Sequence, residues 1–271
     1  MRERADQAGT SMADDEPIEL KDGAAITGMR RAGALVASTL ALLRAHCAPG
    51  VATAELDALA HEHITSQGGV PSFLGYPGPT PYPSAICASI NDEVVHGIPG
   101  PRQLREGDIV TLDVGAVLDG WHGDAAITVA VGAVSAPAAH LIATTEAALA
   151  AGIAVARAGN RLGDISAAIE RVARRAGCGI VPEFTGHGIG HEMHEAPTVR
   201  NYVDRQLGSG PRLRAGMTFT IEPIFTLGAA ETETLPDGWT ICTRDHGLAA
   251  HVEHTVAVAA HGPAFVLTRQ G

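Results

Sequence analysis

Aromatic and basic residues are scarce in this chain. Phe, Trp and Tyr make up 4% of its 271 residues, so we expect a core built mainly from Ala, Val, Leu and Ile. Lys and Arg number 19 against 30 Asp and Glu, which leaves a formal net charge of −11. Nucleic-acid binding needs basic side chains that neutralise phosphates, so this balance argues against a nucleic-acid substrate.

Cysteine motifs and a leading apolar segment are missing as well. No two of the four cysteines form a CxxC pair, which argues against a zinc knuckle or a thioredoxin-like site and favours reduced thiols in the cytoplasm. Residues 1–17 are polar and charged, without the apolar run of a signal peptide, and we interpret them as a disordered tail or an extension. Gly132 and Pro137 interrupt the uncharged stretch 125–145, so we expect no membrane span there.

A repeat is the strongest pattern in the sequence. Two segments, 104–113 and 213–222, each place a polar turn with Gly before an apolar run that ends in a carboxylate, at an offset of 109 positions. Each run precedes a second apolar segment that is led by another carboxylate. The four carboxylates are Asp113, Asp124, Glu222 and Glu253.

The repeat extends to the helices. A period near 3.6 in the apolar residues, ended by Gly or Pro, predicts helices at 24–46, 54–67, 135–157 and 162–176. We expect Thr53 to cap the second helix and Ser135 the third. The fold class is therefore predicted to be α+β: residues 18–271 form one catalytic domain of two pseudo-symmetric halves, about 18–132 and 133–271, whose helices cover a mainly antiparallel sheet.

The four carboxylates indicate a metal site. Side chains on one face of a sheet recur every two residues, so Asp113 and Asp124 approach each other if the chain turns at 118–120. Carboxylates that are buried together repel, and bound divalent cations offset that repulsion. The alternative is that each carboxylate simply ends a strand at the surface. Their matching places in a repeat favour the metal site.

Histidines lie in the glycine-rich segment 183–197, between the two carboxylate pairs. We expect His187 to be a metal ligand and His194 a nearby proton donor, while His191 is the weaker candidate. Residues 191–194 are one position short of the zinc motif HExxH, and the neighbouring glycines disfavour the helix that this motif needs. Carboxylates with one imidazole favour Mn, Fe, Co or Zn. A pair of such ions can share a hydroxide that attacks an amide or a phosphoester, and the acidic chain favours a peptide.

Five short motifs carry a family resemblance. They are NDEVVHGIP at 91–99, LDVG at 112–115, GHGIG at 186–190, IEP at 221–223 and VEHT at 252–255. With these motifs the chain closely resembles the type I methionine aminopeptidases of the pita-bread metallopeptidase family M24, over residues 20–268. The resemblance implies a pita-bread fold with a curved sheet and two divalent ions, which are Co, Mn, Fe or Zn. The implied metal ligands are Asp113, Asp124, His187, Glu222 and Glu253, with Asp124 and Glu253 bridging the ions.

The resemblance also implies roles for other residues. Glu222 would be the general base toward the water, His194 would stabilise the carbonyl oxygen, and His96 would contact the scissile amide or the residue after it. The methionine side chain would bind in an apolar pocket, with an insertion at 77–81 in its wall. The implied pocket residues are His96, Tyr76, Tyr82 and Trp239, together with Phe73 and Met193, which stand where the family usually has Cys and Phe.

The predicted function is removal of the initiator methionine from nascent polypeptides whose second residue is small. We expect a cytoplasmic monomer with transient ribosome contact and no membrane partner. One alternative is an Xaa-Pro aminopeptidase or dipeptidase of the same fold, although those enzymes usually carry a large N-terminal domain and only about 20 residues precede the fold here. The other is a metal-free pita-bread binding module, which the five intact ligand positions disfavour.

Overall fold

The computed structural model describes residues 17–269. Of the predicted tail, 1–17, all but Pro17 lies outside the described residues. The helices are α1 (Gly23–His46), α2 (Thr53–Ser66), α3 (Ala136–Val155) and α4 (Leu162–Ala176). The strands are β1 (Val70–Pro71), β2 (Cys87–Ile90), β3 (Glu93–Val95), β4 (Ile109–Leu118), β5 (Trp121–Ala130), β6 (Gly179–Ile180), β7 (Gly186–Gly188), β8 (Glu195–Val199), β9 (Thr218–Ile221), β10 (Ile224–Thr226), β11 (Thr232–Thr234), β12 (Ile241–Thr243), β13 (Ala249–His251), β14 (His254–Ala257) and β15 (Phe265–Val266).

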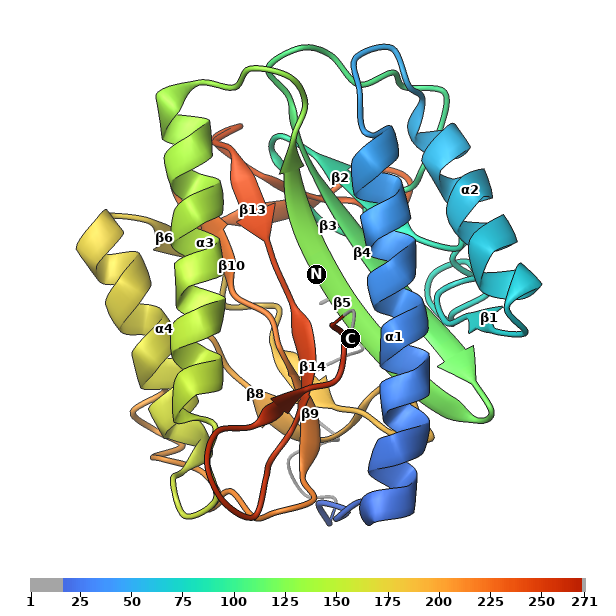
Figure 1. The fold of residues 1–271 in the computed structure, drawn as a ribbon. Coiled ribbons are helices and arrows are strands. Elements are labelled where there is room, and N and C mark those ends of the chain that lie inside the picture. The colour runs from blue at the N-terminus through green and yellow to red at the C-terminus, as the bar shows by residue number, and fades with distance from the viewer. Residues whose placement is uncertain (1–16, 270–271) are drawn as a thin grey trace, which may run out of the picture.

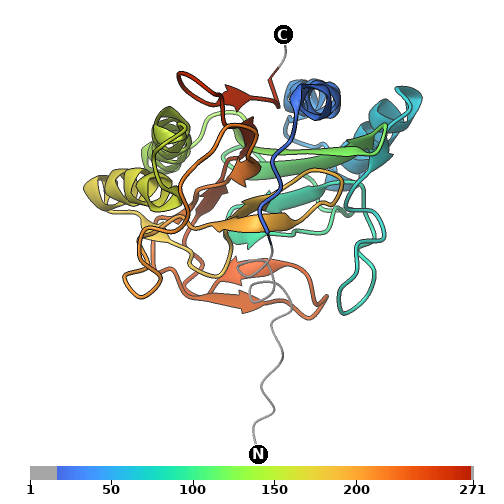
Figure 2. The same ribbon diagram turned by 90° about the horizontal axis from the view of Figure 1, so that it is seen from below.

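The four helices cover one side of the strands, α1 and α2 from the first half and α3 and α4 from the second (Figures 1 and 2). Within residues 17–269 every strand pair is antiparallel. The strands run in the orders β1-β4-β2 with β5 beside β4, β15-β14-β9-β7-β8, β13-β10-β6 and β11-β12-β3. This confirms the predicted α+β class with helices on a mainly antiparallel sheet.

The helix starts follow from local hydrogen bonds. Asp22 caps α1 by accepting from the Ala25 N–H at 2.8 Å, and Ser135 caps α3 as predicted. The prediction that Thr53 caps α2 was wrong, because the helix begins at Thr53 and Ala52 is the capping residue. Ala52 has no polar side chain, and the Glu55 carboxylate accepts from its N–H at 2.9 Å instead. The Thr53 hydroxyl donates to the Gly100 carbonyl.

The duplication is visible in matched backbone hydrogen bonds. The N–H of Gly50 donates to the Leu104 carbonyl at 2.8 Å, and 109 positions later Gly159 N–H donates to Leu213 at 2.9 Å. Both glycines have φ of +94°, a region that glycine enters without steric cost. The predicted turn between β4 and β5 is a two-residue hairpin turn, with φ of +52° at Asp119 and +78° at Gly120, typical of type I′.

The two halves meet where β5 lies beside the start of β14. Ala126 and Glu253 exchange two backbone hydrogen bonds, of 2.9 and 3.3 Å. On one side of them the Thr255 hydroxyl bonds the Asp124 backbone, and on the other side the Thr128 hydroxyl bonds the His251 backbone. An offset of 127 positions relates each residue of β5 to its counterpart in the second half: Asp124 to His251, Ala126 to Glu253 and Thr128 to Thr255. A pseudo-two-fold axis therefore passes between Ala126 and Glu253.

This axis corrects one prediction about the carboxylates. Asp113 and Glu222 do occupy equivalent positions, but the equivalent of Asp124 is His251, and the equivalent of Glu253 is Ala126. The two second carboxylates are therefore offset from each other by two residues. Because side chains two residues apart share a strand face, both still point to the same side.

Each half has its own apolar core. Leu43, Ile64 and Val110 belong to the first cluster, and Leu141, Ile169 and Phe219 to the second. The helix α3 is long and apolar enough to cross a membrane by length and composition alone, and it is the only such helix in the described part of the chain. Here its buried residues, such as Leu141, pack into the second core, as in a buried helix of a globular protein.

Candidate metal centre

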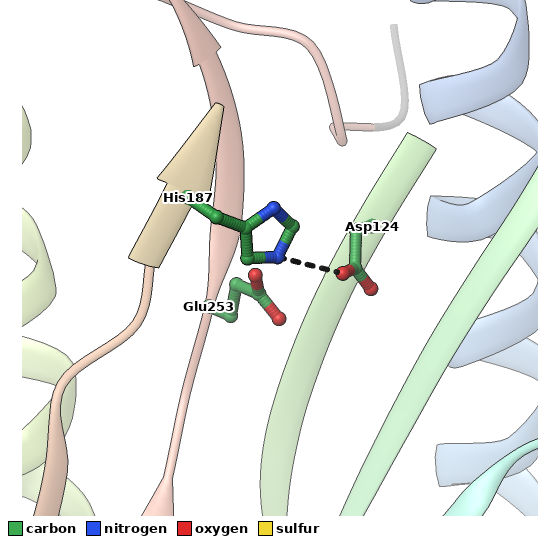
Figure 3. A group of neighbouring side chains, drawn as sticks. All are labelled: Asp124, His187 and Glu253. Carbon is green, nitrogen blue, oxygen red and sulfur yellow. Dashed lines mark ion pairs between the residues drawn. The ribbon is translucent and has the colours of Figure 1, made fainter. Parts of the chain in front are cut away.

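The five residues predicted as metal ligands come from both halves and lie around the pseudo-two-fold axis. Asp113 lies on β4, Asp124 on β5 and His187 on β7, while Glu222 directly follows β9 and Glu253 directly precedes β14. Asp124, His187 and Glu253 point toward one another (Figure 3), and each offers one ligand atom within 4.8 Å of the others. The His187 Nε2 lies 3.7 Å from Asp124 Oδ2.

Strand register explains how the carboxylates come together. On β4 and β5, Gly115 is opposite Asp124, so Asp113 is its diagonal neighbour on the same face. On β9 and β14, Ile221 is opposite His254. Continuing this register by one residue puts Glu222 opposite Glu253.

The carboxylates are buried and incompletely paired. Asp124, Glu222 and Glu253 are 4%, 8% and 2% exposed. In the described part of the chain, Asp113 Oδ1, Asp124 Oδ1 and Glu253 Oε1 are buried without any hydrogen-bond partner. Such orphaned oxygens are rare in folded proteins, and they are the atoms that a divalent cation would need.

The pKa shifts of these residues also fit a site for divalent cations. Burial, followed by repulsion from neighbouring carboxylates, raises the pKa of Asp113 and of Glu253 well above its usual range. Burial raises the pKa of Glu222 to about 7, although His187 opposes the rise. Burial alone would lower the pKa of His187, but the carboxylates of Asp124 and Glu222 raise it on balance. Divalent cations would relieve this repulsion, so the residues fit a metal centre.

Hydrogen bonds outside the cluster orient its members. The His187 Nδ1 lies 2.9 Å from the Gly188 carbonyl, so when Nδ1 donates there, Nε2 is left as the ligand atom facing Asp124. Thr220 accepts from the His187 backbone N–H and donates to Glu222 Oε1. The Asn201 amide donates to the Glu222 carbonyl at 2.9 Å.

The glycine-rich motif gives β7 its close contacts. A Cβ on Gly188 would lie 2.0 Å from the Ala196 carbonyl oxygen, and a Cβ on Gly186 would lie 2.4 Å from the Thr220 carbonyl oxygen. Only glycine fits at these distances, so the motif brings the strand that carries His187 against both neighbours.

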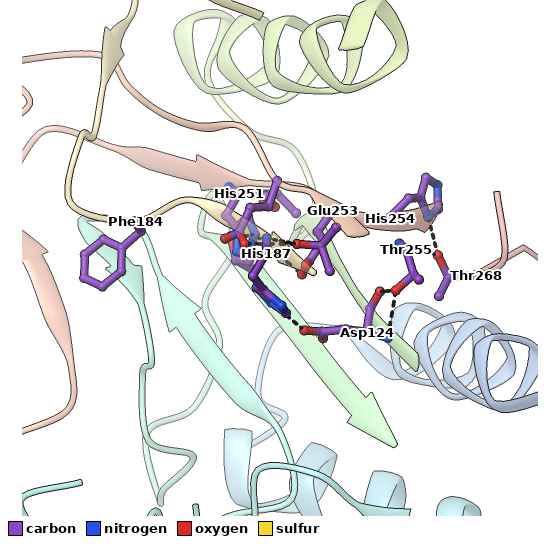
Figure 4. Close-up of polar contacts among 12 residues, drawn as sticks. Asp124, Phe184, His187, His251, Glu253, His254, Thr255 and Thr268 are labelled. Carbon is purple, nitrogen blue, oxygen red and sulfur yellow. Dashed lines mark hydrogen bonds and ion pairs between the residues drawn. The ribbon is translucent and has the colours of Figure 1, made fainter. Parts of the chain in front are cut away.

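His251 contributes to the centre more than the sequence indicated. Its Nε2 lies 3.7 Å from Glu222 Oε2 and 3.9 Å from Glu253 Oε2, and burial lowers the pKa of the ring to about 3. His254 is different, because its ring bonds the Thr268 hydroxyl, away from the predicted ligands (Figure 4). The alternation of side chains along a strand could have separated the two histidines, since His251 shares a strand face with Glu253 and His254 does not.

The predicted proton donor His194 lies beside the centre. Its ring centroid is 4.1 Å from that of His187, and its Nδ1 is 2.7 Å from the Tyr76 hydroxyl. Desolvation, followed by the nearby imidazoles, lowers the pKa of His194, although part of the side chain remains exposed at the rim. The ring is therefore neutral near pH 7. The contact with Tyr76 joins residues 118 positions apart, and no sequence pattern pointed to it.

Aromatic side chains from both halves pack together where the methionine pocket was predicted. The ring centroids of Tyr82 and Trp239 are 5.1 Å apart, and those of His96 and Trp239 are 6.3 Å apart. Phe184, which was not predicted, packs edge-on against His96 at 5.4 Å. Its place just before the GHGIG motif, in a chain poor in aromatics, was a signal that could have indicated it.

Met193, Phe73 and the segment 77–81 were also predicted to belong to the pocket wall. Met193 is 6% exposed and belongs to the loop that carries His194. Phe73 packs over Gly115, where an added Cβ would lie 2.8 Å from its ring. In the 77–81 insertion, the Thr80 carbonyl accepts from Trp239 Nε1 at 3.0 Å, so the insertion holds this wall residue.

Comparison with known proteins agrees with this geometry. Residues 27–260 match metallopeptidase family M24. The chain belongs to that family. It is 46% identical to the methionine aminopeptidase of Clostridium acetobutylicum, over 91% of this chain and 97% of that protein. It is 49% identical to methionine aminopeptidase 1 of Mycobacterium tuberculosis, over 88% and 90%.

Solved structures distinguish two groups of M24 folds. The crystal structure of methionine aminopeptidase from Rickettsia prowazekii superimposes with a TM-score of 0.89 at 41% identity, covering 93% of this chain and all of that one. An Xaa-Pro dipeptidase from Bacillus anthracis shares the fold at a TM-score of 0.72 and 22% identity, and the match covers 62% of it. Within M24, this chain therefore lies with the methionine aminopeptidases, and the predicted pita-bread fold is confirmed. Membership in M24, a metallopeptidase family, implies a divalent metal, which the buried carboxylates fit.

Proposed function

We propose that this protein removes the N-terminal methionine from polypeptides whose second residue is small. One observation carries the proposal: Asp124 and Glu253 meet His187, and among the described residues each of these carboxylates has a buried oxygen without a hydrogen-bond partner. The identity of 40% and more to methionine aminopeptidases supports the same function.

The proposed cofactor is a pair of divalent ions, with Co, Mn, Fe and Zn as the candidates. We assign them to Asp113, Asp124, His187, Glu222 and Glu253. Asp124 and Glu253, whose carboxylate oxygens lie within 4.8 Å of each other, would hold the ions in common, as the family resemblance implies. When bound, two ions of this kind polarise a peptide carbonyl and activate a water molecule.

The chain supplies the proton-handling groups. Glu222 is the proposed general base, and hydrogen bonds from Thr220 and Asn201 hold it in place. His194 is neutral, so when Tyr76 donates to its Nδ1, the Nε2 carries the proton. That N–H can donate to the carbonyl oxygen as negative charge develops on it. His96 lies on the pocket side, against Phe184 and Trp239, where it can contact the scissile amide.

The proposed binding site for the methionine side chain is apolar. Tyr82, Trp239 and Met193 supply apolar surface, with Tyr76 and Phe73 at its edge. Complete burial of a methionine side chain contributes about 1.5–3 kcal/mol, and contact of its sulfur with aromatic rings adds to this. We also propose that the protein acts on nascent polypeptides in the cytoplasm. It would act as a monomer and contact the ribosome transiently.

The test measures metal content and peptide turnover on the same purified sample. The expected result is release of methionine from a Met-Gly peptide in proportion to bound divalent metal, without cleavage of an Xaa-Pro peptide. Cleavage of Xaa-Pro alone would identify an Xaa-Pro peptidase. A protein that hydrolyses neither peptide with Mn, Fe, Co or Zn would be a binding module.

Substitution of His194 by Ala separates its proposed role from metal binding. Turnover should fall while metal content stays near that of the wild type, since His194 is assigned to the substrate oxygen. Loss of bound metal in this variant would show that His194 is a ligand.

A further inference from the structure

Lys21 is a buried cation outside the metal centre. Its side chain is 1% exposed, and its ammonium lies 2.9 Å from Glu195 Oε2. It also pairs with the carboxylate of Glu19, which is 59% exposed. An ammonium buried to this extent needs compensating carboxylates, so these contacts fix the position of the side chain.

The backbone around Lys21 is held as well. Its N–H donates to the Gly216 carbonyl at 2.7 Å, in the turn before β9, and the next residue, Asp22, caps α1. The ammonium therefore projects from a segment tied to both a helix and the strand that leads to Glu222.

The partner residue, Glu195, ends the loop that carries His194. We call residues 190–195 the His194 loop. The second oxygen of Glu195 accepts from the Glu192 N–H at 3.2 Å, so one carboxylate joins Lys21 to the interior of the loop. Gly190 lies against the same ion pair, because a Cβ there would be 2.5 Å from Lys21 Cε and 2.6 Å from Glu195 Oε1.

The opposite end of the His194 loop is anchored to the β4–β5 hairpin. The His122 N–H donates to the Gly190 carbonyl at 2.9 Å. The His191 ring stacks on Trp121 at 3.6 Å, and its Nδ1 lies 2.7 Å from the Gly120 carbonyl. Between the two anchors lies His194, so its position depends on both.

We propose that Lys21 is a positioning residue that, through its ion pair with Glu195, holds the His194 loop and so places His194 over the metal centre. The inference rests on the proposed function, because it assigns a consequence for turnover to the placement of His194. A displacement of about 1 Å in a group that acts on the transition state can cost about 100-fold in rate.

The main test variant is Lys21→Met, which keeps the length of the side chain and removes its charge. We expect kcat for release of methionine to fall about 10- to 100-fold, with KM and metal content close to wild type. In the full chain, hydrogen exchange at the Glu192 amide should become faster, because its acceptor Glu195 is no longer fixed. The matched control is Arg31→Met, which removes an ion pair with Asp119 in which both side chains are about 60% exposed. It should change none of these quantities.

A second variant covers the case in which Lys21→Met does not fold. Glu195→Gln keeps the shape of the side chain, and Lys21 retains Glu19 as a partner. It should lower kcat in the same direction by a smaller factor. The double variant should lose no more activity than Lys21→Met alone, because the two residues act as one unit.

The inference is overturned if kcat of both variants stays at the wild-type value while exchange at Glu192 accelerates. It is also overturned if kcat and metal content fall in proportion, since Lys21 would then serve only the stability of the fold. Wild-type protein that binds metal but releases no methionine would overturn the proposed function instead. The exchange measurement would then decide by itself whether Lys21 holds the loop.

Discussion

Substituting Tyr76 by Phe tests whether this residue orients His194 or only lines the pocket. The exchange removes the hydroxyl that lies 2.7 Å from His194 Nδ1 and leaves the ring in place. The hydroxyl is half-buried, and desolvation raises its pKa, so it stays protonated and able to donate at neutral pH.

The expected loss follows from a single neutral hydrogen bond. Such a bond contributes about 0.5–1.5 kcal/mol net, and if it acts only on the placement of His194 during reaction, kcat falls by about 2- to 13-fold. KM should not change, because the ring that is proposed to contact the substrate is retained. Metal content should also be unchanged, since the Tyr76 hydroxyl bonds His194, which is not one of the five proposed ligands.

The assay compares kcat and KM for methionine release from a Met-Gly peptide at saturating metal. Tyr82→Phe is the comparison variant, because the buried Tyr82 hydroxyl bonds the carbonyls of Ile86 and Gly97 and does not contact His194. It should lower the melting temperature without a selective loss of kcat. A higher KM with unchanged kcat in Tyr76→Phe would mean that this residue only binds substrate, and the assigned orientation of His194 would be wrong.

Three further measurements probe the proposed centre and a cysteine outside it. Gly188→Ala should abolish metal binding, because the new Cβ would lie 2.0 Å from the Ala196 carbonyl oxygen and displace the strand that carries His187. The check is the metal content of purified variant that is expressed at the wild-type level. Chelation should lower the melting temperature, and readdition of metal at 100 times its dissociation constant should restore about 2.7 kcal/mol of unfolding free energy. Burial raises the pKa of Cys47 to about 11, so its alkylation should be slow at pH 8 and accelerate as the pH rises toward 11.

Much of the fold could be predicted because both copies of the repeat show the same short-range patterns of glycines and apolar residues. Glycines at positive φ recur at 50 and 159, and the helix and hairpin boundaries fall within a few residues of the expected ones. Asp113 and Glu222 follow directly from the repeat, since each closes the same apolar run in the sequence. The strands themselves differ, because β4 continues to Leu118 and β9 ends at Ile221. The cap of α2 was missed because the acceptor comes from Glu55, three residues inside the helix, and a capping residue without a polar side chain gives no signal.

Contacts between distant segments could not be predicted in the same way. The Tyr76–His194 hydrogen bond and the Lys21–Glu195 ion pair join residues 118 and 174 positions apart. Each depends on how a loop packs after the sheet has formed, and neither residue type nor spacing specifies that packing. The sequence therefore indicates the proposed metal ligands, which lie on strands or directly beside them, more fully than the groups that orient His194.

The departure from symmetry at the centre has a physical reason. If the repeat were complete, Ala126 and His251 would also be carboxylates, as their equivalents Glu253 and Asp124 are. Two more negative charges in this buried space would add repulsion, and the two divalent ions proposed above would not balance six carboxylates. With Ala126 and a neutral His251 instead, four carboxylates remain, which is the charge that the two proposed ions would match. The duplicated fold thus supplies two equivalent strands, while the differences between its halves adjust the charge of the site.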